Sequence, residues 1–231
     1  METSDFVSNV GRMSLLAGSA VLAGAASGQI EYTPVGGVDG LLDGDGDIVP
    51  IDFNGDGTRE FEVFYEEPAA GNLNIKLEAF PDVDANNVTD EILVDPTQAA
   101  GNSNNPLALA LGEAIDPNET ATRAWQFIGR TDTGLSPSGV SNSNGGGNFR
   151  NVGVEEFIGV RTVIDGNTHY GWVGIQITAL DDASDVLTGV VTGYAYETTP
   201  GVGIAAGAIP APGTAALLAL GAIGASSRKR R

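Results

Sequence analysis

Residues 156–178 read Glu-Phe-Ile-Gly-Val-Arg-Thr-Val-Ile-Asp-Gly-Asn-Thr-His-Tyr-Gly-Trp-Val-Gly-Ile-Gln-Ile-Thr, two apolar runs with a short polar break between them. The break, Asp165-Gly166-Asn167, is typical of a tight hairpin turn, because Asp and Gly tolerate the positive φ angles that such turns require. The sequence therefore predicts two neighbouring antiparallel strands, one at residues 156–164 and one at 170–178.

Similar patterns occur on both sides of this hairpin. At residues 59–65, Phe61, Val63 and Tyr65 alternate with polar residues and would lie on one face of a strand. Thirty-three glycines, with many Asn and Asp, separate the apolar segments, a pattern typical of an all-β domain. We expect an antiparallel β-sandwich, jelly-roll-like or similar, with long Gly/Asn-rich loops. Further strands are predicted at residues 73–80, 123–128 and 186–196.

Two segments fit this pattern less clearly. Residues 106–114 begin with Pro106 and alternate Leu with Ala. We interpret them as a short helix or a turn within a loop, although the alternation is equally compatible with a strand. Residues 135–148 are rich in Ser, Asn and Gly and predict a long polar loop with little means to pack. We expect one domain rather than two halves divided by this loop.

The N-terminus has the features of a secretory signal peptide, which we expect to be helical. Arg12 precedes an apolar stretch at residues 15–26, which ends in small residues. The stretch is shorter than the ~20 apolar residues of a membrane span. We place the signal peptidase cut after Gly28, with Ala25 as a second choice.

The last residues, 209–231, form a second segment that a folded core does not need. Pro210-Ala211-Pro212 precedes a small-residue apolar run at 213–225, which we expect to be helical and to enter the inner membrane transiently. The chain ends in Arg228, Lys229, Arg230 and Arg231, which would stop transfer and stay on the cytoplasmic side. The sequence thus divides into a signal peptide (1–28), an acidic β-domain (29–208) and a C-terminal sorting segment (209–231).

This combination of Pro-x-Pro, apolar run and terminal basic cluster resembles the PEP-CTERM sorting signal of Gram-negative and planctomycete-type bacteria. Residues 169–208, with Tyr170-Gly171-Trp172-Val173, also look like the region before the tail in many such proteins. The resemblance implies recognition by an exosortase, a membrane cysteine protease, with cleavage near 210–212 and delivery to the cell surface. The chain departs from the usual motif at Ala211, where Glu is common.

The composition excludes several classes of site and partner. The net charge is −19, and the body alone is more acidic because four basic residues lie in the tail. Nucleic acids and anionic membranes require a basic face, so we expect neither to bind the body. The chain has no cysteine, which excludes disulfides, cysteine-based zinc sites and thiol nucleophiles.

The strongest candidate site is a calcium loop at residues 52–60. Oxygen ligands stand at alternate positions, a glycine follows the third, and an acid stands at the ninth, a spacing typical of short calcium loops. The Glu of an EF-hand's twelfth position is replaced by Val63, so we do not expect an EF-hand. An ordinary Asp/Asn/Gly turn is the alternative. The predicted ligands are Asp52, Asn54, Asp56, the Thr58 carbonyl and Glu60.

A weaker acidic run lies just before this loop. Asp43, Asp45 and Asp47 could supply further ligands or hold a second ion, and a solvated acidic turn explains them equally well.

Catalytic candidates are few. His169 is the only histidine, and we expect it to pack in or beside a strand. Glu155 and Glu156 more simply begin a strand than form a glycosidase pair, because acids are abundant throughout. Core packing accounts for Trp172, Tyr194 and Tyr196. We expect a protein that is not an enzyme.

The sequence favours an exported, non-catalytic surface or extracellular-matrix protein, stabilised by calcium and associated with exopolysaccharide. One alternative is a calcium-dependent carbohydrate-binding module, which would use Phe53, Tyr65 or Trp172 as exposed aromatic residues. A secreted polysaccharide hydrolase is a third interpretation.

Overall fold

The computed structural model describes residues 29–69, 72–79, 90–97, 105–118, 120–127, 138–142 and 147–210 of the chain. These residues form antiparallel β-structure, with one 3-10 turn, η1 (Gly37–Gly40), as the helical element of the described part. The all-β prediction is confirmed. The expected helices at 1–28 and 213–225 lie outside the described residues.

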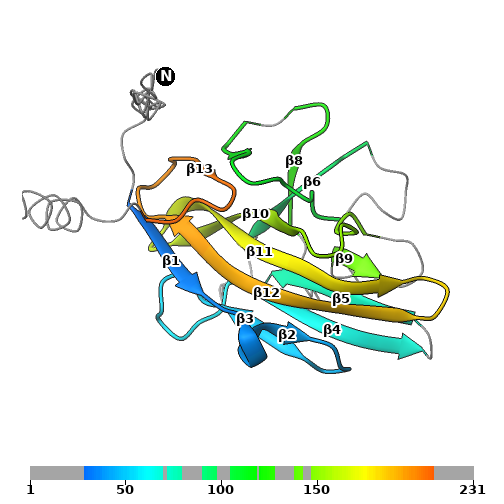
Figure 1. Cartoon of the computed structure of the whole chain (residues 1–231). Helices are drawn as coiled ribbons and strands as arrows, with labels where there is room; N and C mark the ends of the chain where they lie inside the picture. Colours follow the sequence, from blue (N-terminus) through cyan, green and yellow to red (C-terminus); the bar gives the residue numbers. More distant parts are fainter. Residues whose placement is uncertain are drawn as a thin grey trace, which may run out of the picture.

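The larger of two main sheets has the strand order β1-β12-β11-β10-β6-β8. Each of its pairings is antiparallel, and β2 (Leu41–Leu42) adds to the outer side of β12 next to β1 (Figure 1). Its strands are β1 (Ile30–Pro34), β12 (Val186–Glu197), β11 (Asn167–Asp181), β10 (Glu155–Ile164), β6 (Glu91–Val94) and β8 (Ala124–Phe127).

The smaller sheet has the order β3-β4-β5-β9 and is also antiparallel. A separate two-stranded pair joins β7 (Ala114–Ile115) to β13 (Ile204–Ala205). The strands of the smaller sheet are β3 (Ile48–Ile51), β4 (Phe61–Ala69), β5 (Asn72–Ala79) and β9 (Ser138–Asn142).

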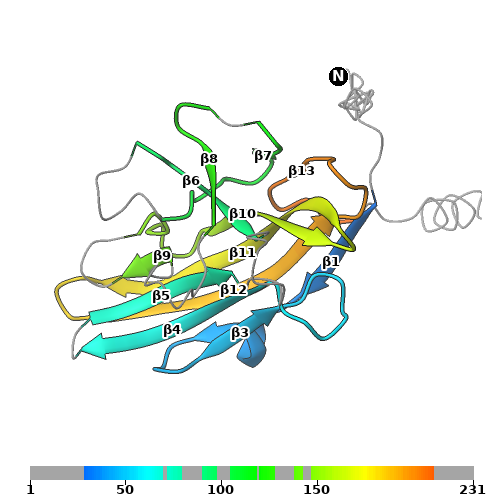
Figure 2. The ribbon, with the colours of Figure 1, turned by 180° about the vertical axis from the view of Figure 1, so that it is seen from behind.

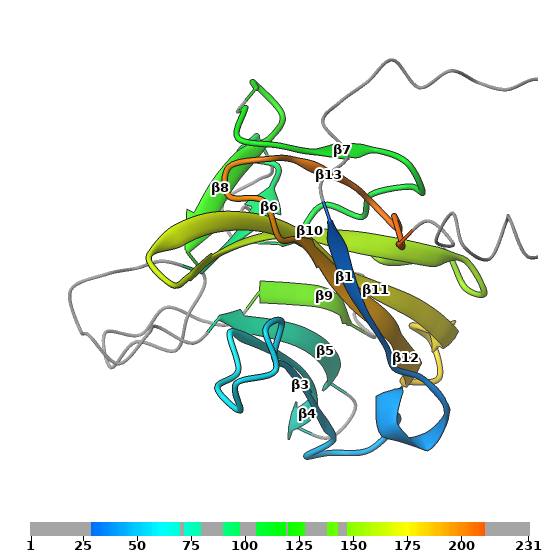
Figure 3. The same cartoon turned by 90° about the vertical axis from the view of Figure 1, so that its left-hand side faces the viewer.

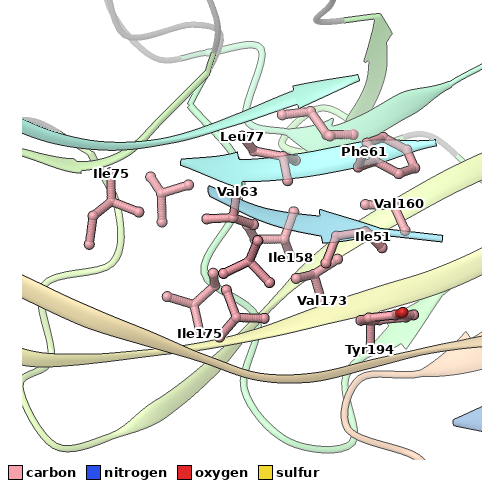
Figure 4. Packing of buried hydrophobic residues seen from close by; sticks show 14 of the residues in the cluster. Ile51, Phe61, Val63, Ile75, Leu77, Ile158, Val160, Val173, Ile175 and Tyr194 are labelled. Atoms are coloured by element: carbon pink, nitrogen blue, oxygen red, sulfur yellow. The ribbon is translucent and has the colours of Figure 1, made fainter. Parts of the chain in front are cut away.

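The two main sheets face each other across a common apolar core. In Figure 3, β3, β4 and β5 form one layer, and β10, β11 and β12 form the other. Phe61, Val63 and Tyr65 all point into this core, as their alternation predicts. Figure 4 shows how side chains of the two layers meet. Members labelled there include Ile51, Ile75 and Leu77 from the smaller sheet and Ile158, Val160, Val173, Ile175 and Tyr194 from the larger.

A second apolar cluster covers the opposite face of the larger sheet. Phe157, Tyr170 and Trp172 point to this side, and segments from residues 105–118 and 204–208 lie over them. Because both faces of β10 and β11 are buried, these strands read as nearly continuous apolar runs rather than as an alternation.

The predicted hairpin is confirmed. Ile164 pairs with Asn167, which leaves Asp165 and Gly166 as the two loop residues. Their φ angles are 52° and 76°, both positive as a type I′ turn requires.

The helix that we considered for residues 106–114 is not formed. Pro106 and Leu109 form isolated bridges with Val94 and Phe157, a turn follows, and β7 then begins at Ala114. The segment lies over the outer face of the larger sheet, where Leu109 is buried. Leu107 and Leu109 both pack in the outer cluster, as alternate residues of an extended segment do, whereas Leu111 lies in the turn and is 74% exposed.

The prediction of a polar loop at 135–148 is wrong for its central part. Residues 138–142 form β9, which pairs with β5 at the edge of the smaller sheet. Val140 is fully buried in the core between the sheets, and this burial stabilises a strand in an otherwise polar segment. Residues 135–137 and 143–146 lie outside the described part.

Candidate functional site

The loop at residues 52–60 connects β3 to β4 and is organised around Asp52. One carboxylate oxygen of Asp52 accepts the Gly55 N–H at 2.7 Å, and the other accepts the Gly57 N–H at 2.8 Å. Gly55 and Gly57 have φ angles of 70° and 88°, which residues other than glycine rarely adopt. The glycine after the third predicted ligand therefore makes the sharp bend that the sequence predicts.

Asn54 and Asp56 continue the same arrangement on the exposed side of the loop. Asn54 Oδ1 accepts the Asp56 N–H at 3.1 Å, and Asp56 Oδ1 accepts the Thr58 N–H at 2.7 Å. The Asn54 amide also donates to Asp56 Oδ2 at 3.0 Å. The Thr58 N–H, followed by the Asn54 amide, lowers the pKa of Asp56, so its carboxylate stays ionised.

Glu60 differs from the other predicted ligands because its carboxylate is buried. Its Oε2 accepts the Phe53 N–H at 2.8 Å, and this bond ties the loop to the core. The Phe53 ring packs against Phe61, Tyr194 and Tyr196, with centroids 5.5–6.1 Å apart. Burial raises the pKa of Glu60 to about 7, and the nearby charges of Asp52 and Asp90 act in the same direction.

The donor chemistry of the exposed half of the loop fits calcium. Asp52, Asn54 and Asp56 offer hard oxygen donors, and an oxygen that accepts one N–H keeps a lone pair for a cation. Glu60 would first have to leave the Phe53 N–H. Within the described ranges, no group of three or more His, Asp or Glu side chains is placed to hold a metal. Calcium binding at this loop stays a prediction.

The carboxylates of the weaker acidic run accept hydrogen bonds from nearby backbone N–H groups. Asp47 Oδ2 accepts the N–H groups of Asp43 and Gly44, at 2.9 and 2.7 Å, and Asp45 Oδ1 accepts the Glu67 N–H at 2.9 Å. The run lies at the opposite end of β3 from Asp52, roughly 16 Å away at ~3.3 Å per strand residue. It is therefore too distant to complete the site at Asp52, and a second ion stays a prediction.

His169 lies within β11 and is buried, as expected for a packed histidine. Its Nδ1 is 2.8 Å from the Glu197 carbonyl oxygen, an acceptor, so Nδ1 carries the proton and donates. The ring also packs against Tyr196, with centroids 5.7 Å apart. These contacts account for the burial of His169 within the fold.

Glu155 and Glu156 begin β10, as predicted. Glu155 accepts the hydroxyl of Thr192, and Glu156 accepts the side-chain amide of Asn151. Consecutive strand residues point to opposite faces, so the two carboxylates do not face a common substrate position.

The three aromatic residues considered for sugar stacking are all buried. Phe53, Tyr65 and Trp172 are 3%, 4% and 2% exposed, so none presents a ring face to a ligand. Tyr194 and Tyr196 are buried as well, which confirms the interpretation of Trp172 and these tyrosines as core residues.

A feature that sequence reasoning missed lies where the chain leaves the domain. Residues 204–208, here called the strap, cross the outer face of the larger sheet. Ile204 pairs with Ile115 in β7, and the Trp172 indole donates to the Ala208 carbonyl at 3.0 Å. The next residue, Ile209, is 57% exposed. The run of small residues in the strap was the available signal, because small side chains allow close approach to a covered face.

The two ends of the described chain lie at one corner of the domain (Figures 1 and 2). Gln29, directly after the predicted signal peptidase cut, accepts the Thr198 N–H at 2.9 Å. Ile30 and Ala208 pack against the same apolar cluster. Pro210 is described and exposed, whereas Ala211, Pro212, Arg228, Lys229, Arg230 and Arg231 lie outside the described residues.

Across the ranges that the structure describes, no helix has the length and apolar character required to cross a membrane. Neither a protein-family model, nor a curated protein, nor a solved structure matches the chain.

Proposed function

We propose that the chain is an exported, non-catalytic protein of the cell surface or extracellular matrix, whose C-terminal segment is processed by an exosortase-type enzyme. The supporting observation is the fit of the folded body between the two proposed processing sites. The first described residue, Gln29, already takes part in the fold, and the last anchored residue, Ala208, stands two positions before Pro210. Contacts of the described body thus begin directly after the proposed signal peptidase cut and continue to two residues before the proposed processing motif.

The contacts of the catalytic candidates support a non-catalytic role. His169 donates to a backbone carbonyl inside the fold, and the two glutamates that begin β10 bond to separate neighbours. The burial of Phe53, Tyr65 and Trp172 weighs against the alternative of a carbohydrate-binding module, which would need an exposed aromatic face.

Two finer statements belong to the same proposal. We expect a jelly-roll-like topology, which the face-to-face antiparallel sheets favour. We also expect the loop around Asp52 to bind calcium and thereby stabilise the domain. An association with exopolysaccharide would then use polar groups or bound calcium, because the body is acidic.

The mass of the mature protein from producing cells tests the sorting proposal. We expect a chain that begins at Gln29 and ends near Pro210 to Pro212. Deletion of residues 213–231 should abolish the membrane-retained precursor, because the apolar run that holds it is then missing. Replacement of the four C-terminal basic residues by alanine is the milder companion variant. A mature protein that keeps Arg231 would refute the proposal.

A further inference from the structure

The strap directly precedes the proposed processing motif, and backbone hydrogen bonds hold it against the domain. The Ala206 N–H donates to the Glu113 carbonyl at 2.8 Å, and the Ala206 carbonyl accepts the Gly112 N–H at 2.9 Å. Within the strap itself, the Ala208 N–H donates to the Ala205 carbonyl at 3.0 Å. With the indole bond of Trp172 to Ala208, these contacts occupy the polar backbone groups that a protease would use to hold an extended substrate.

The side chains of the strap are closely packed as well. Ile204 and Ala206 are buried in the outer apolar cluster. A Cβ atom added to Gly207 would come within 2.4 Å of Leu111 Cδ1 and 2.7 Å of Phe157 Cζ. The strap is therefore a fitted part of the fold, held by Trp172 and by the β7 pairing.

The free chain between the strap and the motif is very short. Only Ile209 separates Ala208 from Pro210, and an extended chain covers at most ~3.6 Å per residue. A membrane protease that binds several extended residues before its cleavage point would therefore collide with the domain or require strap residues that are already bonded.

We propose that release of the strap from Trp172 and β7 limits the rate of C-terminal processing, an inference that rests on the proposed sorting function. The protease then acts on the small fraction of molecules whose strap is undocked. Docking of the strap decides when the body leaves the membrane, because a chain that has folded completely is cut more slowly than one whose strap is open.

A disulfide staple tests this directly, because the chain has no cysteine of its own. Ala114 and Ala205 stand opposite each other in the β7–β13 pair, and directly opposed antiparallel positions bring Cβ atoms near disulfide distance. The double variant Ala114→Cys/Ala205→Cys should close the strap under oxidising conditions. Ala205→Cys alone is the matched control.

The rate of conversion from precursor to mature protein is measured by pulse–chase in a host that carries an exosortase. We expect the oxidised double variant to be processed at least about fivefold more slowly than the control. Fivefold is roughly the factor by which one net hydrogen bond changes an equilibrium constant. Addition of a membrane-permeant thiol reductant should restore the rate. Processing of the oxidised variant at the control rate would overturn the inference.

A second variant keeps the test decisive if the staple does not form. A flexible Gly-Ser spacer of about six residues, inserted between Ala208 and Ile209, lengthens the chain between the strap and Pro210 while the strap stays docked. We expect faster processing of the spacer variant, and unchanged processing would overturn the strap inference while leaving sorting intact. A wild-type chain that retains its C-terminus would instead refute the sorting proposal together with the inference.

Discussion

The loop at residues 52–60 carries one acidic side chain at the surface and another that is buried. Asp52 lies at the surface of the loop and accepts the N–H groups of Gly55 and Gly57. Glu60 is buried and accepts the N–H of Phe53. The spacing of the acids predicted that they share one loop. It did not predict which of them would be buried, because that depends on the packing of Phe53 against β12.

Glu60 should make stability depend on pH in a direction opposite to that of an ordinary paired carboxylate. Its pKa is about 7 in the folded chain against an ordinary value of 4.5, so the folded state binds the proton more tightly. This contribution to stability is complete below pH 4.5 and is lost as pH rises through 7. Urea unfolding of wild type and Glu60→Gln, with chelator at pH 5 to 8, measures it.

The comparison of the two proteins isolates Glu60 from the many other acids. Gln keeps an oxygen that accepts the Phe53 N–H but does not ionise. The variant should therefore gain stability relative to wild type as pH rises. Parallel stability profiles for the two proteins would contradict the assignment.

The calcium prediction is tested at Asp52 and Asp56. If the loop binds calcium, Asp52→Ala together with Asp56→Ala should abolish the rise in melting temperature that calcium produces in wild type. Melting in calcium and in chelator measures this rise, and the chelator series also records the cost of the lost turn hydrogen bonds.

Asp43→Ala together with Asp45→Ala is the matched control. It removes two acids at the opposite end of β3 and should leave most of the calcium response in place. An unchanged response in the Asp52/Asp56 variant would exclude this loop as the site.

At the scale of elements, the hairpin between β10 and β11 is the best-determined part of the fold. Asp165 and Gly166 both adopt positive φ, and the register then pairs ten residues of β10 with ten of β11. A turn of two residues sets the register, so local sequence is sufficient to predict this pairing.

Gly166 should be sensitive to β-branched replacement. Gly166→Val places a branched side chain at a φ of 76°, and we expect a loss of about 1–2 kcal/mol in the free energy of unfolding. Asp165→Asn should be close to neutral, because Asn-Gly is also a preferred type I′ pair. Urea unfolding of both variants measures the difference. Equal stability of Gly166→Val and wild type would contradict the turn assignment.

Other strands were less predictable because their evidence is not local. The alternation in β4 and the continuous apolar runs of β10 to β12 are visible in the sequence. In contrast, β1, β3 and β6 are short, and β9 lies in a polar segment. Of these four, β1, β6 and β9 form because partners far along the chain complete their hydrogen bonds, as β5 does for β9, whereas β3 pairs with β4, the next strand.

At the scale of the whole molecule, the central part of the larger sheet is buried on both sides. The smaller sheet covers one face, and the strap with residues 105–118 covers the other. Trp172 contacts both ends of the domain, because it packs against Tyr32 of β1 and its indole donates a hydrogen bond to the Ala208 carbonyl. Both ends of the domain are thus secured at one side chain.

The sequence alone determined the all-β class, the central hairpin, the inward face of β4 and the acidic turn at residues 52–58. Each of these depends on side-chain periodicity or on backbone preferences within a few neighbouring residues. Only the tertiary structure decided that Glu60 and Phe53 are buried, that residues 138–142 form a strand, and that the strap is bonded to Trp172 and β7. Such features require contacts between residues distant in sequence, and periodicity along one segment carries no information about the surface that it will meet.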